Sequence, residues 1–192
     1  DFSDTLAGSA IVSYTDVSVD RTGEVDEAGR RVGVVDDERE YDVLGLKLDG
    51  RYATERWLHR AGLELRGLSA DYDYASAVRF EPGYPFPESA ERVTVQALDP
   101  APSGTHLATY ATSRVLATER LAVELGLRWE TQSYAETDSD RQWSPRVNLV
   151  YAAGDTTRLR ASWGRYGQFQ GINELQVEDG IDEFFPTQKA DH

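Results

Sequence analysis

The side chains that could carry out chemistry are few in this chain of 192 residues, and they do not form a recognisable site. Its three histidines stand at positions 59, 106 and 192, without the short spacing of a metal site. The glycines around Gly167 have the wrong spacing for a dinucleotide-binding loop. The chain contains no cysteine, which excludes thiolate and disulfide chemistry. We therefore expect no cofactor and no metal.

Carboxylates are abundant, but their setting indicates solvated surface and not catalysis. The pairs Glu178-Asp179 and Asp182-Glu183 lie in a segment rich in charge, where acidic clusters usually face water. A weak calcium site in residues 178–183 stays open as an alternative, because Ca²⁺ takes several oxygen ligands from one loop. No nucleophile, base and orienting partner occur together, so we expect no enzyme.

The overall composition narrows the class of protein further. The formal net charge of -14 argues against nucleic acid as a partner, because phosphate binding needs a basic surface. No stretch reaches the roughly 18 to 20 apolar residues that a membrane-spanning helix needs. A β-barrel is not excluded by that test, because its strands alternate apolar and polar side chains and keep the mean hydropathy low.

Apolar residues recur with a period of two, which is the signature of β-strands. The clearest case is residues 120–130, whose odd positions from Leu121 to Trp129 are all apolar while the even positions are polar or small. The expected strands are residues 7–19, 43–48, 56–66, 105–115, 120–130, 146–151 and 158–164. The fold class predicted is all-β, an antiparallel up-and-down meander of about seven strands that forms part of a transmembrane β-barrel.

The links between these expected strands are alternately short and long. Asp49-Gly50, Ala117-Thr118 and Gly154-Asp155 predict short turns. The long polar links are residues 20–42, 68–104, 131–145 and 168–192. In a meander, successive turns fall at opposite ends, so all short turns should lie at one end and all long loops at the other. Short turns at one end and long loops at the other are typical of outer-membrane barrels.

Charge and aromatic residues fit the same arrangement. The four long links together carry a net charge of -16 against -14 for the whole chain, so the strands and short turns net +2. Most strand arginines share the polar parity, and near the midplane of a lipid-facing surface each would cost about 2 to 4 kcal/mol. Trp57 should lie near the short turns, and Trp129, Trp163, Tyr134 and Tyr166 near the long loops, as two interfacial girdles. We expect four arginines to line a wet lumen: Arg56, Arg128, Arg158 and Arg160.

From Tyr41 onward the sequence resembles the barrel domain of TonB-dependent outer-membrane receptors. The stretch Ser144-Pro145-Arg146, a strand, a small-residue turn and then residues 159–166, Leu-Arg-Ala-Ser-Trp-Gly-Arg-Tyr, are similar to a recurring segment of that barrel wall. The resemblance implies that residues 1–192 are a partial barrel domain, with the family's plug and its C-terminal strands outside the chain. It carries over no catalytic or ligand residue, because these motifs are structural.

The function expected from this resemblance is a share in uptake across the bacterial outer membrane. The whole receptor would bind a scarce ligand such as a ferric siderophore, with its own plug domain, the TonB complex reached through the missing N-terminal region, and outer-membrane lipid as partners. Two alternatives remain open at this point. One is a soluble secreted β-sandwich that acts as a binding module, and the other is a passive porin-like barrel.

Overall fold

The computed structural model describes residues 5–86, 88, 90–135 and 141–191. These residues form nine strands and one short 3₁₀ helix, η1 (Val177–Asp179). The strands are β1 (Leu6–Glu27), β2 (Arg31–Ala53), β3 (Trp57–Phe80), β4 (Arg92–Leu98), β5 (Ser103–Leu116), β6 (Leu121–Gln132), β7 (Arg141–Ala152), β8 (Arg158–Gln168) and β9 (Gln188–Asp191). Within the described residues, no helix is long and apolar enough to cross a membrane.

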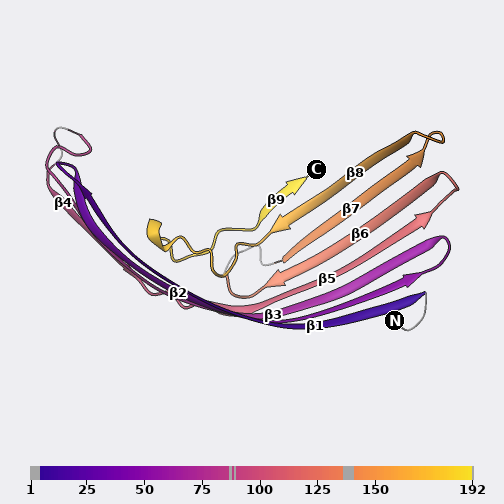
Figure 1. The fold of residues 1–192 in the computed structure, drawn as a ribbon, viewed down its shortest axis with the longest axis horizontal. Coiled ribbons are helices and arrows are strands. Elements are labelled where there is room, and N and C mark those ends of the chain that lie inside the picture. Colours follow the sequence, from indigo (N-terminus) through magenta and orange to yellow (C-terminus); the bar gives the residue numbers. More distant parts are fainter. Residues whose placement is uncertain (1–4, 87, 89, 136–140, 192) are drawn as a thin grey trace.

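All described strands belong to one antiparallel sheet in the order β1-β2-β3-β5-β6-β7-β8-β9, with β4 beside the outer part of β3. Seven of these strands are long and follow each other as an up-and-down meander, which confirms the predicted fold class. Figure 1 shows that the sheet is strongly curved, with the segment between β8 and β9 lying inside its hollow. No second sheet covers it within the described residues, so the β-sandwich alternative is wrong.

The two faces of the sheet differ in polarity because side chains alternate across a strand. Cross-strand pairing places Trp57, Val115, Val123 and Leu149 in one continuous row of the first face. The large apolar side chains of this face stay exposed; Leu125, for example, is 55% exposed. An uncovered apolar surface of this extent is what a lipid-facing barrel wall requires. The opposite, polar face is the concave one.

One of the three predicted short turns is wrong. Asp49-Gly50 lies inside β2, where Asp49 pairs with Ser9 and Gly50 with Gly8, and the chain reverses at residues 54–56 instead. At that turn, the backbone N–H of Thr54 donates to the carbonyl of Trp57 at 2.8 Å. An Asp-Gly pair favours a turn only where neighbouring strands do not already satisfy its backbone groups. The other two turns are confirmed, at residues 117–120 and 153–157.

The prediction of long polar loops over residues 20–42 and 68–104 is also wrong. Most of those residues extend β1, β2 and β3, and the link between β1 and β2 is only residues 28–30. Strict alternation of short and long links therefore fails for the first pair of strands. These strand parts lack the apolar alternation of the wall because charged side chains occupy the face that water solvates. Of the predicted link 131–145, residues 136–140 lie outside the described part of the chain.

This extension gives the excess negative charge a definite side of the sheet. On the outward, convex face, pairing places Asp16 opposite Asp42, and Asp20, Glu38 and Asp73 in one row. Like charges directly opposite each other destabilise a sheet, so this face depends on water or counter-ions. We call these residues the acidic ladder: Asp16, Asp20, Asp36, Glu38, Glu40, Asp42, Asp71 and Asp73.

Candidate functional site

The concave face carries a connected set of polar side chains across β3, β5, β6 and β7. The Arg128 guanidinium donates to Glu130 at 2.6 Å and lies 3.7 Å from a Glu64 carboxylate oxygen. Glu130 also accepts from the Gln142 amide at 3.0 Å, and His106 Nε2 lies 3.5 Å from it. Glu130 and Gln142 are buried, and these contacts satisfy both carboxylate oxygens of Glu130 and the amide nitrogen of Gln142, whereas Gln142 Oε1 has no hydrogen-bond partner among the described residues. We call this set the wall network: Glu64, Arg66, His106, Arg128, Glu130 and Gln142.

Glycines in the strands make room for large side chains to lie flat on this face. A Cβ at Gly62 would come within 2.4 Å of the Tyr110 ring, whose hydroxyl donates to Asp49. A Cβ at Gly126 would come within 2.5 Å of Arg146 Nε. The missing side chains therefore let an aromatic ring and a guanidinium cover the strands, at the cost of weaker intrinsic strand propensity.

The four arginines predicted from the sequence do not come together. Arg128 belongs to the wall network and stands opposite Tyr110 and Ser144. Arg160 pairs with Val150 and Arg158 with Ala152, six and eight residues further along β7 than Ser144. At about 3.3 Å per residue, Arg160 is roughly 20 Å from Arg128 along the strand. Arg56 lies in the turn before β3, and all three distant arginines are exposed.

A second cluster lies on the same face in the extension of the sheet beyond this region. Asp37 of β2 is only 2% exposed. It accepts from Arg39 Nε at 2.7 Å and from Arg39 Nη2 at 2.9 Å, and it is also paired with Arg21 of β1. Burial raises the pKa of Asp37, but the hydrogen bonds and charges of Arg39 and Arg21 outweigh it, so the net pKa is lowered. The carboxylate is therefore held in its ionised form.

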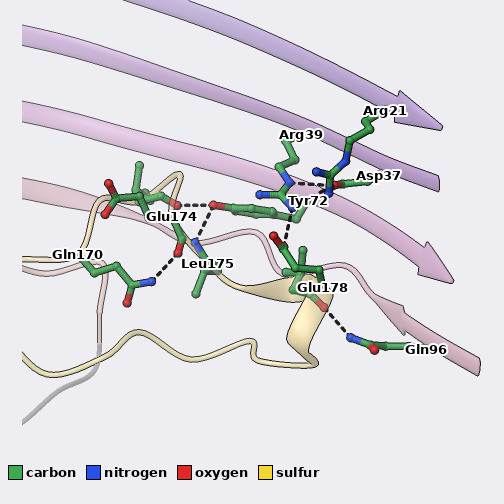
Figure 2. A network of polar contacts seen from close by, with 11 residues as sticks. Arg21, Asp37, Arg39, Tyr72, Gln96, Gln170, Glu174, Leu175 and Glu178 are labelled. Carbon is green, nitrogen blue, oxygen red and sulfur yellow. Dashed lines mark hydrogen bonds and ion pairs between the residues drawn. The ribbon is translucent and has the colours of Figure 1, made fainter. Parts of the chain in front are cut away.

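Arg39 also connects the sheet to the segment after β8. We call residues 169–187, which include η1, the strap. Figure 2 shows the Arg39 guanidinium between Asp37 and Glu178 of the strap, and its distance to Glu178 is 2.8 Å. The same guanidinium lies 5.6 Å from the centre of the Tyr72 ring. Burial raises the pKa of Glu178, but its own backbone hydrogen bond and Arg39 together lower it by more, so the net pKa is below normal.

Tyr72 of β3 anchors the strap because its hydroxyl both donates and accepts a hydrogen bond. It donates to the carbonyl of Ile172 at 2.8 Å and accepts from the backbone N–H of Leu175 at 3.3 Å. Its burial, at 4% exposed, raises the pKa of the phenol. On the strap, the side chains of Ile172, Leu175 and Val177 are almost fully buried. They pack in one cluster with three residues of β3: Ala70, Tyr72 and Tyr74.

The strap cluster gives the curved sheet a small hydrophobic core of its own. Fully burying an aliphatic side chain contributes about 1.5 to 3 kcal/mol, so three of them outweigh the ordering of a short segment only with help from the polar contacts. That help comes from Tyr72 and Arg39, and from Gln96 of β4, whose amide donates to the carbonyl of Val177. The strap is therefore held across β2, β3 and β4.

Two of the aromatic residues expected in the outer girdle lie on the concave side instead. The Tyr134 ring packs against Phe184 of the strap at 5.4 Å, and its hydroxyl donates to the carbonyl of Gln170 at 2.9 Å. Tyr166 lines a cavity with Arg128 and Glu130. By contrast, Trp129 lies 6.2 Å from Trp143 on the apolar face, as interfacial aromatics do.

The sequence does not predict the contacts of the strap with β2 and β3, because the polar character of those parts of the chain predicts loops. One signal was present: Asp71, Tyr72, Asp73 and Tyr74 alternate with a period of two. The aspartates belong to the acidic ladder, while the tyrosines are buried under the strap. Aromatic and acidic residues that alternate with a period of two indicate a strand, just as alternating aliphatic and polar residues do.

The concave face has two cavities large enough to hold a polar solute. A cavity of about 280 Å³ lies between the strap and the sheet, lined by Arg39, Tyr41, Tyr72 and Asn173 among others. A second cavity, of about 470 Å³, borders the wall network. Within the described residues, no three His, Cys, Asp or Glu side chains are grouped to hold a metal ion. His192 lies outside those residues.

Comparison with known proteins agrees with the geometry of the sheet. The protein family described as TonB dependent receptor-like, beta-barrel matches residues 1–187. The comparison with curated proteins gave no match. With its curved antiparallel meander, exposed apolar convex face and polar concave face, the chain belongs to the TonB-dependent receptor β-barrel family, whose members stand in the bacterial outer membrane and transport solutes without catalysing a reaction.

Proposed function

We propose that the full-length protein takes up a scarce solute, such as a ferric siderophore, in a TonB-dependent manner, and that this chain supplies part of its barrel wall and vestibule. The observation that carries the proposal is the docking of the strap inside the hollow of the sheet. A solute that passes along the concave face meets the strap and the wall network in turn. Side chains on that face are therefore placed to contact the solute or a plug domain.

In this proposal, residues 1–192 are a partial barrel domain, and the plug and the C-terminal strands belong to the rest of the protein. The TonB complex acts through an N-terminal region, outer-membrane lipid covers the apolar face, and a small-molecule ligand enters from the side of the strap. Arg56, Arg128, Arg158 and Arg160 line the lumen and offer positive charge to the plug or to an anionic solute. Arg128 does so as part of the wall network, whereas the other three stand nearer to the short turns.

The test replaces each of these four arginines by leucine in the full-length protein, with uptake of ferric siderophores and stability of the plug as readouts. Arg79→Leu is the matched control, because Arg79 lies on the convex face near the tip of β3 and pairs with Glu81 at 2.9 Å. We expect at least the Arg128 variant to lower uptake or loosen the plug while Arg79→Leu changes neither. If all four variants behave as the control does, the arginines have no role in the lumen.

Energy coupling provides the second arm of the experiment. Uptake that stops when the proton-motive force is collapsed supports TonB dependence, because the energised complex is needed to displace the plug. Uptake that continues unchanged at the same external concentration points to a passive barrel and refutes the proposed function.

A further inference from the structure

A group of exposed valines lies at the outer tip of the sheet, on the convex face. Val34 of β2 is in one row with Ala77 of β3 and Val95 of β4, and Val32 is in one row with Arg79 and Val93. The four valines are between 43% and 73% exposed. We call them the tip patch: Val32, Val34, Val93 and Val95. An open hollow of about 620 Å³ lies against Val34, Ala77 and Val95.

The tip patch is separate from the lipid-facing surface. Leu44 is the outermost residue of the apolar rows on β2, and Val34 lies ten residues before it on the same strand. At about 3.3 Å per residue this is roughly 33 Å along the strand. The acidic ladder occupies the whole interval, and carboxylates of that density do not enter a hydrocarbon layer. Lipid tails therefore cannot be what covers the tip patch.

The surroundings of the tip patch define the charge of whatever binds there. Asp36 stands in the row next to Val34, and Glu38 and Asp73 follow in the row after that. These carboxylates have no cation opposite them within their rows. A second copy of this chain would bring the same carboxylates, so self-association through this face is disfavoured. A partner with apolar side chains at one end and basic ones at the other is complementary.

The backbone of β4 adds a second feature of the same surface. Within the described residues, β4 pairs on one side only, with β3, so its other edge presents unpaired N–H and C=O groups. Proteins usually protect such an edge with lysine, proline or a bulge. Residues 93–98 contain neither lysine nor proline, and two of these residues are the exposed valines Val93 and Val95. An extended chain can therefore pair with β4 and lie beside the tip patch.

We propose that the edge of β4 and the tip patch bind an extended segment of a partner polypeptide outside the cell, in which apolar and basic side chains alternate with polar ones. Its apolar side chains lie over Val93 and Val95, and its basic side chains lie toward Asp36 and Asp73. The backbone of the segment continues the sheet beyond β4. This interaction is independent of solute uptake, because it uses the convex face and not the concave one.

The test uses the full-length protein in lipid nanodiscs and a fluorescent synthetic peptide with serine at every second position. The positions between the serines are valine in one half of the peptide and lysine in the other half, so that valines and lysines share one face of the strand, and binding is followed by anisotropy. We expect saturable binding that weakens as salt rises, and no binding of the peptide in which glutamate replaces lysine. Val95→Lys should weaken binding about tenfold or more. The matched control is Val19→Lys, because Val19 is also exposed, at 47%, but lies on the concave face of β1.

Two N-methylated forms of the peptide separate strand pairing from simple charge attraction and need no protein variant. One form is methylated at the odd residues and the other at the even residues, so only one of them loses the N–H groups that pair with β4. We expect one form to lose binding and the other to keep it. Equal binding of both forms, equal binding of the glutamate peptide, or no saturable binding of the lysine peptide would each overturn the proposal.

Discussion

The hydroxyl of Tyr72 is the most direct test of how the strap is held. Tyr72→Phe removes the oxygen that accepts from the Leu175 N–H and donates to the Ile172 carbonyl, and it leaves the ring in place. Two buried backbone groups then lose their partner, each at a cost of about 1 kcal/mol or more. No cavity forms, because only one atom is lost. We expect the free energy of strap opening to fall by about 2 kcal/mol.

Hydrogen exchange of the strap amides measures this change in the full-length protein in nanodiscs. A loss of about 2 kcal/mol corresponds to roughly 30-fold faster exchange when the exchange rate is proportional to the equilibrium population of the open strap. Tyr74→Phe is the matched control. Tyr74 is 5% exposed in the same cluster on the same strand, but among the described residues its hydroxyl makes no hydrogen bond to the strap. Equal effects of the two substitutions, or no effect of Tyr72→Phe, would refute the role of this hydroxyl.

Three further outcomes follow from the structure. The pKa values of Asp37 and Glu178 are lowered in the folded protein, so the ion pairs stabilise it above the ordinary pKa values of 3.8 and 4.5, and this stabilisation is lost as the pH falls further. Strap amides should therefore exchange faster below about pH 4 than the change in pH alone explains. Without such an acceleration, the ion pairs would not hold the strap. Gly62→Ala should cost about 1 to 3 kcal/mol in unfolding free energy because its Cβ meets the Tyr110 ring, while Gly67→Ala, with nothing within 4 Å of its Cβ, should cost little; thermal unfolding in detergent compares the two. Leu125→Arg on the apolar face should cost about 2 to 4 kcal/mol in guanidinium unfolding from lipid vesicles, and Thr112→Arg on the concave face should cost much less; similar losses would mean that the faces are misassigned.

The wall of the sheet could be predicted from the sequence because its cause is local. Residues 120–130 alternate strictly, and they form β6 with the expected faces. Lipid on one side and water on the other impose that alternation residue by residue. The outer parts of β1, β2 and β3 could not be predicted in the same way. Water bathes their convex face, where the acidic ladder takes the place of apolar residues, so the apolar period disappears.

The candidate site was only partly accessible to the same reasoning. Arg128 was expected on the polar face, but its partners Glu64 and Glu130 come from strands that only the register brings together. The sequence predicts a polar loop for the strap, whereas in the structure Ile172, Leu175 and Val177 are its buried anchors. The strap also contains Phe169, Ile181, Phe184 and Phe185, and the sequence identifies neither which of its apolar side chains are buried nor the surface that covers them.

The alternation of apolar and polar faces, and through it the barrel family, follows from the amino-acid sequence alone. Two other features, the docking of the strap and the path of β2 through Asp49-Gly50, depend on the tertiary structure. Curvature of the sheet brings Tyr72 to Ile172, one hundred residues away in the chain, so the strap has a surface to dock on. Pairing with β1 and β3 carries β2 through Asp49-Gly50, because a ladder of hydrogen bonds on both sides outweighs a local preference for a turn.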